Sequence, residues 1–244
     1  MIAAAAGWLW IQREIERPHR GFAAETVTVE VSKGATGKTI LGELESRGVI
    51  RDARVARWVH RFRFRDAPLR SGEYQFVGAQ TVEQVLRTLV RGEVLRHPVT
   101  IPEGWDIEET ARHLAAKGFG AESAFRRAMD DPTPIRDLDP RASSLEGYLF
   151  PETYFFERGA SEAAIVAAMV QAFRDRYREH LEPLRPWPPE LRDLRALVAL
   201  ASLVEKESSA AADIPAKLNR VSPAPLGTAT RSLAAMPSLF MSFE

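Results

Sequence analysis

Two carboxylates and a hydroxyl follow an apolar run at residues 197–204, and they belong to Glu205, Glu207 and Ser208. If residues 194–208 form a helix, Glu207 lies over leucine and valine side chains three, four and seven positions earlier. Apolar surroundings and a position near a helix C-terminus both disfavour the charged form of a carboxylate. Glu207 is therefore a candidate general acid near neutral pH. The plainer interpretation is that both glutamates mark the solvent-exposed end of the helix.

A second candidate site lies in residues 145–154, where aromatic side chains and carboxylates surround a glycine and a proline. Exposed rings beside carboxylates suit a sugar-binding groove, because sugar rings stack their C–H faces on aromatic rings. The alternative is a packed turn that buries its rings, and the residues alone favour neither. The candidate substrate-binding residues are Glu146, Tyr148, Phe150, Glu152 and Tyr154 here, and Ser208 in the first segment.

Several other chemistries lack the residues they need. The chain has no cysteine, and its five histidines have no zinc-ligand spacing, so we expect no metal site. Gly37-Lys38-Thr39 resembles the end of a phosphate-binding loop, but Ser32 stands where that motif needs glycine. Lys206 could form a Schiff base with pyridoxal phosphate, yet no phosphate-binding or pyridine-binding residues accompany it. We therefore expect no cofactor.

The elements expected to position these residues begin with a repeated strand–helix unit over residues 26–119. Each copy has a strand, a turn glycine, a Thr or Asp that caps a helix, and a glycine that ends it. The two glycines are 14 residues apart in every copy. In chain order the turn glycine, cap and final glycine are Gly34, Thr39 and Gly48, then Gly78, Thr81 and Gly92, then Gly104, Asp106 and Gly118.

Between the first two copies, residues 52–64 predict a helix with one apolar face. That face comprises Val55, Trp58, Val59 and Phe62, and arginines at 54, 57, 61 and 63 lie mostly elsewhere on the helix. Arginines among aromatic residues can bind nucleic acid. Because the chain balances 33 basic against 33 acidic residues, a solvated arginine face is the better interpretation, and we expect no nucleic-acid partner.

Two further helices are expected over residues 163–177 and 190–207, separated by a proline-rich stretch at 183–189. In the first helix the buried stripe is predicted to be Ile165, Ala168, Met169, Ala172 and Phe173. Together these elements predict an α+β fold, with a small mixed module followed by a mainly helical region.

Residues 1–11 form an apolar run that includes two tryptophans. A bilayer-spanning helix needs about 20 apolar residues, and tryptophan favours membrane interfaces. We therefore expect residues 1–11 to be part of a transmembrane helix and residues 12–24 to be a linker. The alternative is a short amphipathic or disordered N-terminus.

Three segments carry a resemblance to a known family. Residues 101–105, 145–154 and 201–208 occur in the order and at the spacing found in the YceG-like family of endolytic murein transglycosylases. The resemblance implies an inner-membrane helix, a LysM-like glycan-binding module at residues 25–100, and a periplasmic catalytic domain from residue 101. Peptidoglycan strands are the implied substrate, and the cell-wall synthesis machinery is an implied partner.

The resemblance also assigns roles to residues in the third segment. The family's catalytic glutamate corresponds to Glu207, which precedes Ser208, and Glu205 is the second choice. The implied reaction cleaves the β-1,4 bond between N-acetylmuramic acid and N-acetylglucosamine and leaves a 1,6-anhydro ring. One acid/base residue suffices, because the sugar's own C6 hydroxyl replaces the second carboxylate of ordinary glycosidases.

The resemblance weakens after about residue 212. Residues 213–244 are rich in proline, serine and alanine without periodicity, which predicts a disordered tail and an incomplete catalytic domain over 101–212. The family implies an Asn-Arg pair farther along than Asn219-Arg220. We therefore expect a truncated or frame-shifted chain. The alternative to an active enzyme is an inactive copy that only binds peptidoglycan through its LysM-like module.

Overall fold

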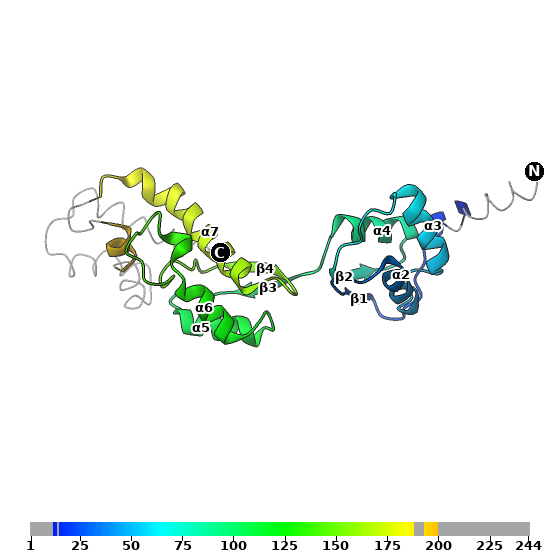
Figure 1. The fold of residues 1–244 in the computed structure, drawn as a ribbon, viewed down its shortest axis with the longest axis horizontal. Helices are drawn as coiled ribbons and strands as arrows, with labels where there is room; N and C mark the ends of the chain where they lie inside the picture. The colour runs from blue at the N-terminus through cyan, green and yellow to red at the C-terminus, as the bar shows by residue number, and fades with distance from the viewer. Residues whose placement is uncertain (1–11, 14, 188–192, 200–244) are drawn as a thin grey trace, which may run out of the picture. The chain divides into compact units, whose positions relative to one another are not determined.

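The computed structural model describes residues 12–13, 15–187 and 193–199, and it divides the chain into two compact units (Figure 1). Unit 1 spans Met1–His97 and unit 2 spans Pro98–Glu244. Both units combine helices with a two-stranded sheet, so the predicted α+β class is confirmed. The expected boundary between residues 100 and 101 and the LysM-like assignment stay predictions.

Unit 1 is built on an antiparallel pair of strands with helices between and after them. Its elements are β1 (Thr26–Val31), α2 (Gly37–Ser46), α3 (Ala53–Arg63), β2 (Gly72–Val77) and α4 (Val82–Arg91). The two strands pair in a register that runs from Thr26 opposite Val77 to Val31 opposite Gly72. The ends of both strands therefore coincide, and no residue of either strand is left unpaired.

The core of unit 1 lies between this sheet and its helices. Tyr74 and Phe76 alternate with exposed residues along β2, as the two-residue period of a strand requires. They pack in one cluster with helix residues such as Leu44 and Leu86, and all four side chains are almost fully buried. Ile15 joins the same cluster at 1% exposure, so the chain just before β1 is part of this unit.

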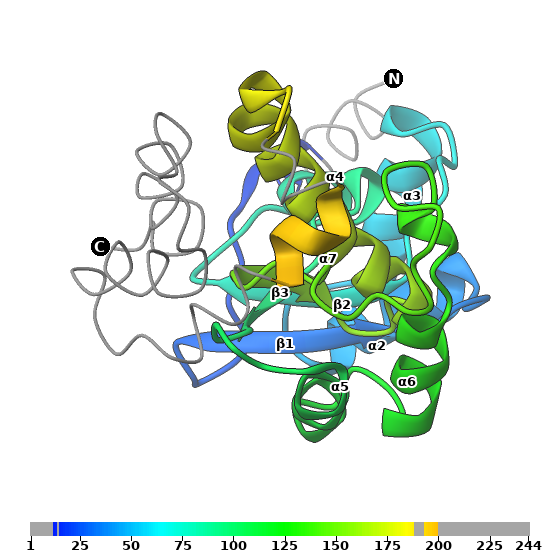
Figure 2. The same cartoon turned by 90° about the vertical axis from the view of Figure 1, so that its left-hand side faces the viewer.

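Unit 2 contains a second sheet, in which β3 (Arg96–Thr100) pairs with β4 (Thr153–Glu157). Its helices are α5 (Ile107–Ala116), α6 (Glu122–Asp130) and α7 (Glu162–Arg176). Short turns follow, with 3-10 helices at Thr133–Ile135 and Glu182–Leu184 and a π-helical turn at Tyr177–Leu181. Residues 194–199 form one more short helix, drawn in orange in Figure 2.

The repeated strand–helix unit is confirmed in all three copies. Each of its six framing glycines has a left-handed backbone, with φ between 67° and 80°. Thr81 and Asp106 cap α4 and α5 and complete capping boxes, as predicted. The first cap was misassigned, because Thr36 accepts the bond and Thr39 donates it through its backbone N–H. The first two copies belong to unit 1, and the helix of the third belongs to unit 2.

The predicted apolar face of α3 is correct for Val59, which is buried, and for Val55 and Trp58, which pack against the core, but wrong for Phe62. Ala56, Val59 and His60 are the buried side chains, whereas Phe62 is 61% exposed. His60 is tolerated inside because its Nε2 forms a 2.7 Å hydrogen bond with the carbonyl oxygen of Ala67. The helix therefore turns Phe62 outward, toward the side that carries the arginines.

The structure describes the two predicted C-terminal helices, 163–177 and 190–207, to different extents. α7 matches the predicted range closely, and Ile165, Met169 and Phe173 are buried as expected. Val166 and Val170 are also buried, so the apolar face of α7 is wider than predicted. Of the second predicted helix, 190–207, only residues 193–199 are described.

The described part of that second helix begins at a side-chain cap. Asp193 accepts a 2.9 Å bond from the backbone N–H of Ala196, and residues 194–199 are helical. Glu205, Glu207, Ser208 and the tail at 213–244 lie outside the described residues, as does the apolar run 1–11. Among the helices that the structure describes, none is long and apolar enough to cross a bilayer.

Candidate active site

A pocket of about 340 Å³ in unit 2 brings together segments that are far apart in the sequence. Three segments supply most of its wall: residues 101–105 after β3, residues 139–151 before β4, and the helix 194–199. Phe173 of α7 completes the wall. The first two segments that carry the family resemblance therefore line one cavity, together with Val198 and Ala199, which precede the third segment at 201–208.

The first wall is the turn between β3 and α5. The backbone N–H of Ile101 donates a 2.9 Å hydrogen bond to the carbonyl oxygen of Glu152. This bond joins the turn to the residue that directly precedes β4. Gly104 allows the turn with φ of 75°. The Trp105 ring then meets His113 of α5 edge-on, with ring centroids 4.9 Å apart. A half-buried tryptophan is thereby held at the pocket by a side chain from the next helix.

Two titratable groups near this turn have shifted pKa values. Burial raises the pKa of the Glu103 carboxyl. Burial, and to a lesser degree the charge of Lys117, lowers the pKa of His113. Both shifts favour the neutral form, so the ring that contacts Trp105 is uncharged over a wider pH range than an exposed histidine.

Glu146 fastens the second wall to the start of α5. Its Oε2 accepts a 3.1 Å hydrogen bond from the backbone N–H of Ile107, the first residue of that helix. The helix N-terminus has unpaired N–H groups and a partial positive charge, so a carboxylate is stabilised there. The Glu146 side chain is exposed and also lines the pocket. This contact anchors the segment whether or not Glu146 also touches a ligand.

A buried hydrogen bond stabilises the second wall of the pocket. Tyr148 donates through its hydroxyl to Asp139 Oδ2 at 2.7 Å, and Asp139 Oδ1 accepts from the backbone N–H of Arg141 at 3.0 Å. Asp139 is 4% exposed and Tyr148 is 3% exposed. Burial and the neighbouring carboxylate raise the pKa of the Tyr148 hydroxyl, which therefore stays protonated and remains a donor.

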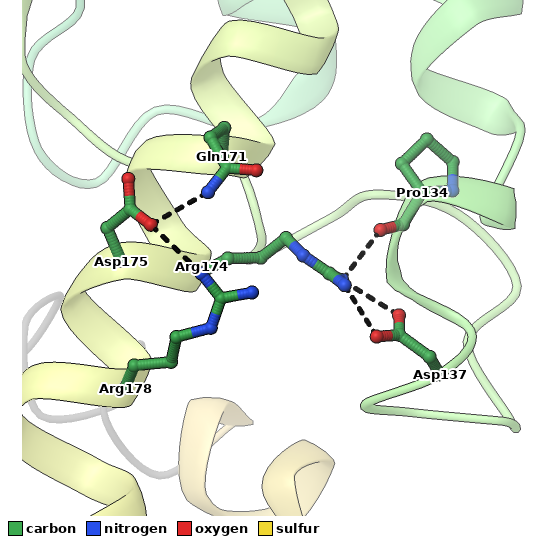
Figure 3. A network of polar contacts seen from close by, with 6 residues as sticks. All are labelled: Pro134, Asp137, Gln171, Arg174, Asp175 and Arg178. Atoms are coloured by element: carbon green, nitrogen blue, oxygen red, sulfur yellow. Dashed lines mark hydrogen bonds and ion pairs between the residues drawn. The ribbon is translucent and has the colours of Figure 1, made fainter.

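Hydrogen bonds from Arg174 attach the loop that carries Asp139 to α7. Arg174 donates to both carboxylate oxygens of Asp137, at 2.7 Å for the Nη1 bond, and to the carbonyl oxygen of Pro134 at 3.0 Å (Figure 3). This paired geometry is the strong form of an arginine–carboxylate contact. The hydrogen bond from Arg174 lowers the pKa of Asp137 below its ordinary range.

The remaining aromatic candidates are also largely buried. Phe150 is 5% exposed and lies under the Arg176 guanidinium. Tyr154 is 9% exposed, donates to the carbonyl oxygen of Phe150 at 2.6 Å and stacks on Phe156. Burial raises the pKa of the Tyr154 hydroxyl. Tyr148 and Phe150 line the pocket, while Tyr154 and Glu152 do not.

The third wall is the helix 194–199. Leu194, Leu197 and Val198 are buried in the unit 2 core, and Val198 faces the pocket. Arg195 also lines the pocket and donates to the carbonyl oxygen of Arg141 at 2.9 Å. Asp193, the cap of this helix, forms an ion pair with Arg141. The helix is therefore attached at two points to the loop that holds Asp139.

The structure favours the packed-turn interpretation for most rings of residues 145–154. Tyr148 and Phe150 line the pocket from inside the core, which leaves little ring surface for stacking, and Tyr154 is buried away from it. Direct contact with a substrate stays a prediction for all five candidates of this segment. Sequence reasoning missed Asp139 and Arg195. Asp139 gave no signal, because its loop has no periodicity. Arg195 could have been found from its position three residues before Val198, on the same helical face.

No metal ion has an obvious place in the described part of the chain. Within those residues, no group of three or more His, Asp or Glu side chains could hold one. Asp139 and Glu146 are the two pocket carboxylates in the described segments, and each already has a protein partner. The lining combines side chains that can bond hydroxyl groups, such as Ser143 and Ser144, with apolar side chains, and this mixture suits a polar, uncharged ring system.

Comparisons with known proteins give the same assignment as the three segments. An endolytic murein transglycosylase of Streptococcus pneumoniae serotype 2 is 23% identical over 213 residues, which cover 77% of this chain and 38% of that protein. The endolytic murein transglycosylase of Bacillus subtilis is 21% identical over 207 residues, covering 77% of this chain and 56% of the relative. The chain thus spans well under two thirds of either relative.

A solved structure is also similar. It is a putative yceG-like protein of Listeria monocytogenes, with 24% sequence identity and a TM-score of 0.41, covering 78% of this chain and 67% of that one. The sequence profile of the YceG-like family matches residues 29–220, which is most of the chain. The chain therefore belongs to the YceG-like family.

Proposed function

We propose that this chain is a lytic transglycosylase that binds a peptidoglycan glycan strand in the pocket of unit 2. One observation carries the proposal: the segments 101–105, 145–151 and 194–199 line a single cavity. The names of the Streptococcus and Bacillus relatives support murein as the substrate class.

The pocket has properties that suit a sugar. Its volume of about 340 Å³ lies at the lower end of the range for small-ligand sites. Trp105 and Leu149 offer apolar surface, while Ser143, Ser144 and Arg195 offer polar groups. A sugar ring has an apolar C–H face and a rim of hydroxyls, so this mixed lining matches it on both counts.

The reaction we propose cleaves the β-1,4 bond between N-acetylmuramic acid and N-acetylglucosamine. Glu207 protonates the leaving oxygen and then, as a carboxylate, takes the proton from the muramyl C6 hydroxyl. The C6 oxygen attacks the anomeric carbon and closes the 1,6-anhydro ring. The nucleophile is tethered to the reacting centre, which favours ring closure entropically and removes the need for water or a second carboxylate.

The sequence distance between the pocket and the proposed acid is short. Glu207 comes eight residues after Ala199, a pocket residue of the described helix, and Ser208 follows it directly. Glu205 comes six residues after Ala199 and is the second candidate for the same role. Cleavage inside nascent strands would limit glycan length, and residues 1–11 would attach the protein to the inner membrane with its catalytic part in the periplasm.

A second candidate function is a binding module without catalysis. Unit 1 has its own hydrophobic core, formed from β1, β2 and their helices, which favours independent folding. A LysM-like unit 1 would bind N-acetylglucosamine units while unit 2 contributes nothing. The two functions differ in product formation, because binding alone leaves the glycan intact.

The test is to incubate the purified chain with uncrosslinked peptidoglycan strands and to detect 1,6-anhydro-muramyl ends by mass spectrometry. Glu207→Gln and Glu205→Gln form a matched pair, since each removes one carboxylate from the same segment. We expect anhydro ends from the parent and from Glu205→Gln, and a loss of about a thousandfold or more in Glu207→Gln. Glycan binding without anhydro ends in any sample would support the binding module instead.

A further inference from the structure

The charge of the chain is unevenly divided between its units. Residues 1–97 contain 16 Lys and Arg against 11 Asp and Glu, whereas residues 98–244 contain 17 against 22. The neutral total therefore conceals a basic unit 1. Much of the excess is concentrated near α3, because residues 51–65 contain six arginines and one aspartate.

The exposed side of α3 combines arginines with aromatic rings. Arg54, Arg57 and Arg61 are exposed and share one helical face, since they lie three, four and seven positions apart. The side chains of Arg54 and Arg61 are 96% and 69% exposed. Phe62 is 61% exposed and its ring lies 4.7 Å from that of half-buried Trp58, along the edge of the same face. We call these five residues the α3 strip.

The positive charge of the α3 strip is only partly balanced. Arg54 lies 3.7 Å from Asp52, whose carboxylate also accepts the backbone N–H of Arg54 as the cap of α3. Arg61 forms a 3.2 Å ion pair with Asp66. Arg57 has no hydrogen bond or ion pair with any residue that the structure describes. The strip therefore presents a net positive charge beside a ring that protrudes into solvent.

The chain segment that follows the apolar run 1–11 is fixed next to this helix. Gln12 Oε1 accepts a 3.5 Å hydrogen bond from Arg63 Nη2 at the C-terminal end of α3, and Ile15 is buried in the core of unit 1. Figure 1 shows this start of the described chain beside α3. The contact between Gln12 and Arg63 places the described start of the chain at the C-terminal end of α3, two residues after Arg61 of the α3 strip.

We propose that the α3 strip docks on an anionic lipid surface. Arg54, Arg57 and Arg61 bind lipid phosphates, and Phe62 and Trp58 enter the boundary between headgroups and acyl chains. Arginines gain from the negative surface potential of anionic lipids, and aromatic rings favour this depth of a bilayer. Docking would fix the orientation of unit 1 at the membrane. Attachment through residues 1–11 alone would not fix this orientation. The proposal does not depend on catalysis by unit 2.

The test is flotation of the full chain with vesicles of phosphatidylcholine alone and of phosphatidylcholine mixed with phosphatidylglycerol. Binding to the neutral vesicles reports apolar insertion, including that of residues 1–11, and the gain with phosphatidylglycerol reports the charge of the protein. The test variant is Arg57→Glu/Arg61→Glu. The matched control is Lys33→Glu/Lys38→Glu, which makes the same charge change at exposed residues of the same unit. Circular dichroism verifies that both variants are folded.

Phosphatidylglycerol should increase vesicle binding about tenfold less for the arginine variant than for the parent. For the lysine control this increase should stay within about twofold of that of the parent. Added salt should weaken the same gain. A further variant, Phe62→Ser, should weaken binding to both kinds of vesicle. Equal losses in both charge variants would overturn the proposal, as would no gain from phosphatidylglycerol. If RNA or glycan binding, but not vesicle binding, depended on Arg57 and Arg61, the strip would belong to that partner instead.

Discussion

Gly147 lies directly against Val198, so closely that a Cβ atom at Gly147 would be 2.6 Å from Val198 Cγ1. The two residues are 51 positions apart in the sequence, and both line the pocket of unit 2. Gly147 also has φ of +80°, a backbone conformation that side chains disfavour. Contact between the second and third walls of the pocket therefore depends on the absence of a side chain at this position.

Gly147→Ala should lower the free energy of unfolding by about 3 kcal/mol, from a left-handed backbone and from overpacking against Val198. The structure offers a matched control in Gly159→Ala, because Gly159 has φ of +81° and nothing within 4 Å of an added Cβ. Gly159→Ala should cost about 1 kcal/mol, the backbone part alone. Hydrogen exchange of peptides from 145–151 and 193–199 measures the change in unfolding free energy for both variants. Equal effects of the two variants would contradict the close approach.

Glu146→Ala should expose the backbone N–H of Ile107 and speed hydrogen exchange in the first turn of α5 by roughly fivefold, since one cap bond is lost. Glu146→Gln should leave this exchange nearly unchanged, because the amide oxygen can still accept the bond. Production of anhydro ends should follow the same order if Glu146 acts by positioning. A Gln variant with normal exchange but no product would show instead that the carboxylate contacts the substrate.

Tyr148→Phe should destabilise unit 2 by about 2 kcal/mol, because it removes a donor from the buried carboxylate of Asp139. Tyr154→Phe is the matched comparison. Its hydroxyl donates to a neutral carbonyl oxygen, that of Phe150, so its loss should cost about 1 kcal/mol. Urea unfolding followed through hydrogen exchange of α7 distinguishes them. A larger effect for Tyr154→Phe would contradict the buried bond from Tyr148 to Asp139 as the stronger of the two contacts.

Asp137→Asn should loosen the loop at 133–139 by about 0.5 kcal/mol at neutral pH, a modest amount because the ion pair with Arg174 is partly exposed. Arg174 holds the folded-state pKa of Asp137 below its ordinary value of 3.8. The contribution of the carboxylate is therefore fully present above that value and disappears as the pH falls through the lowered pKa.

The measurement for this pair is hydrogen exchange of the 133–139 peptide across that pH range. Parent and Asp137→Asn should differ at neutral pH and converge in strong acid. Asp175→Asn serves as the control, because Asp175 bonds to Gln171 on α7 and to Arg178 in the π-helical turn that follows, on the side of Arg174 away from the loop (Figure 3). A pH-independent difference for Asp137→Asn would contradict the ion pair as its cause.

Local signals in the sequence predicted the elements of this fold well. The paired glycines placed the helices α2, α4 and α5, because a left-handed residue and a side-chain cap act within a few positions of each other. The buried face of α3 was predicted only in part, for a tertiary reason. His60 is buried only because the Ala67 carbonyl meets it, and no helical pattern in residues 52–64 contains that contact.

The candidate site was predicted in part. Two of the three segments identified by residue type and order, 101–105 and 145–154, meet at the pocket, but the partners of their side chains were not predicted. The bond from Ile107 to Glu146 and the bond from Tyr148 to Asp139 join residues through folding of a loop without periodicity. Such contacts depend on three-dimensional packing, so the turn residues alone could not tell an exposed aromatic groove from a buried one.

The most direct test of the account asks where the glycan binds. A short peptidoglycan oligosaccharide is titrated into the isotope-labelled Glu207→Gln chain, and amide chemical shifts are followed by NMR. We predict shifts at pocket residues of unit 2, notably Gly104, Trp105, Gly147 and Leu149. Shifts confined to residues 26–91 of unit 1, with these four amides unmoved, would contradict the pocket as the substrate site and leave the binding module as the function of the chain.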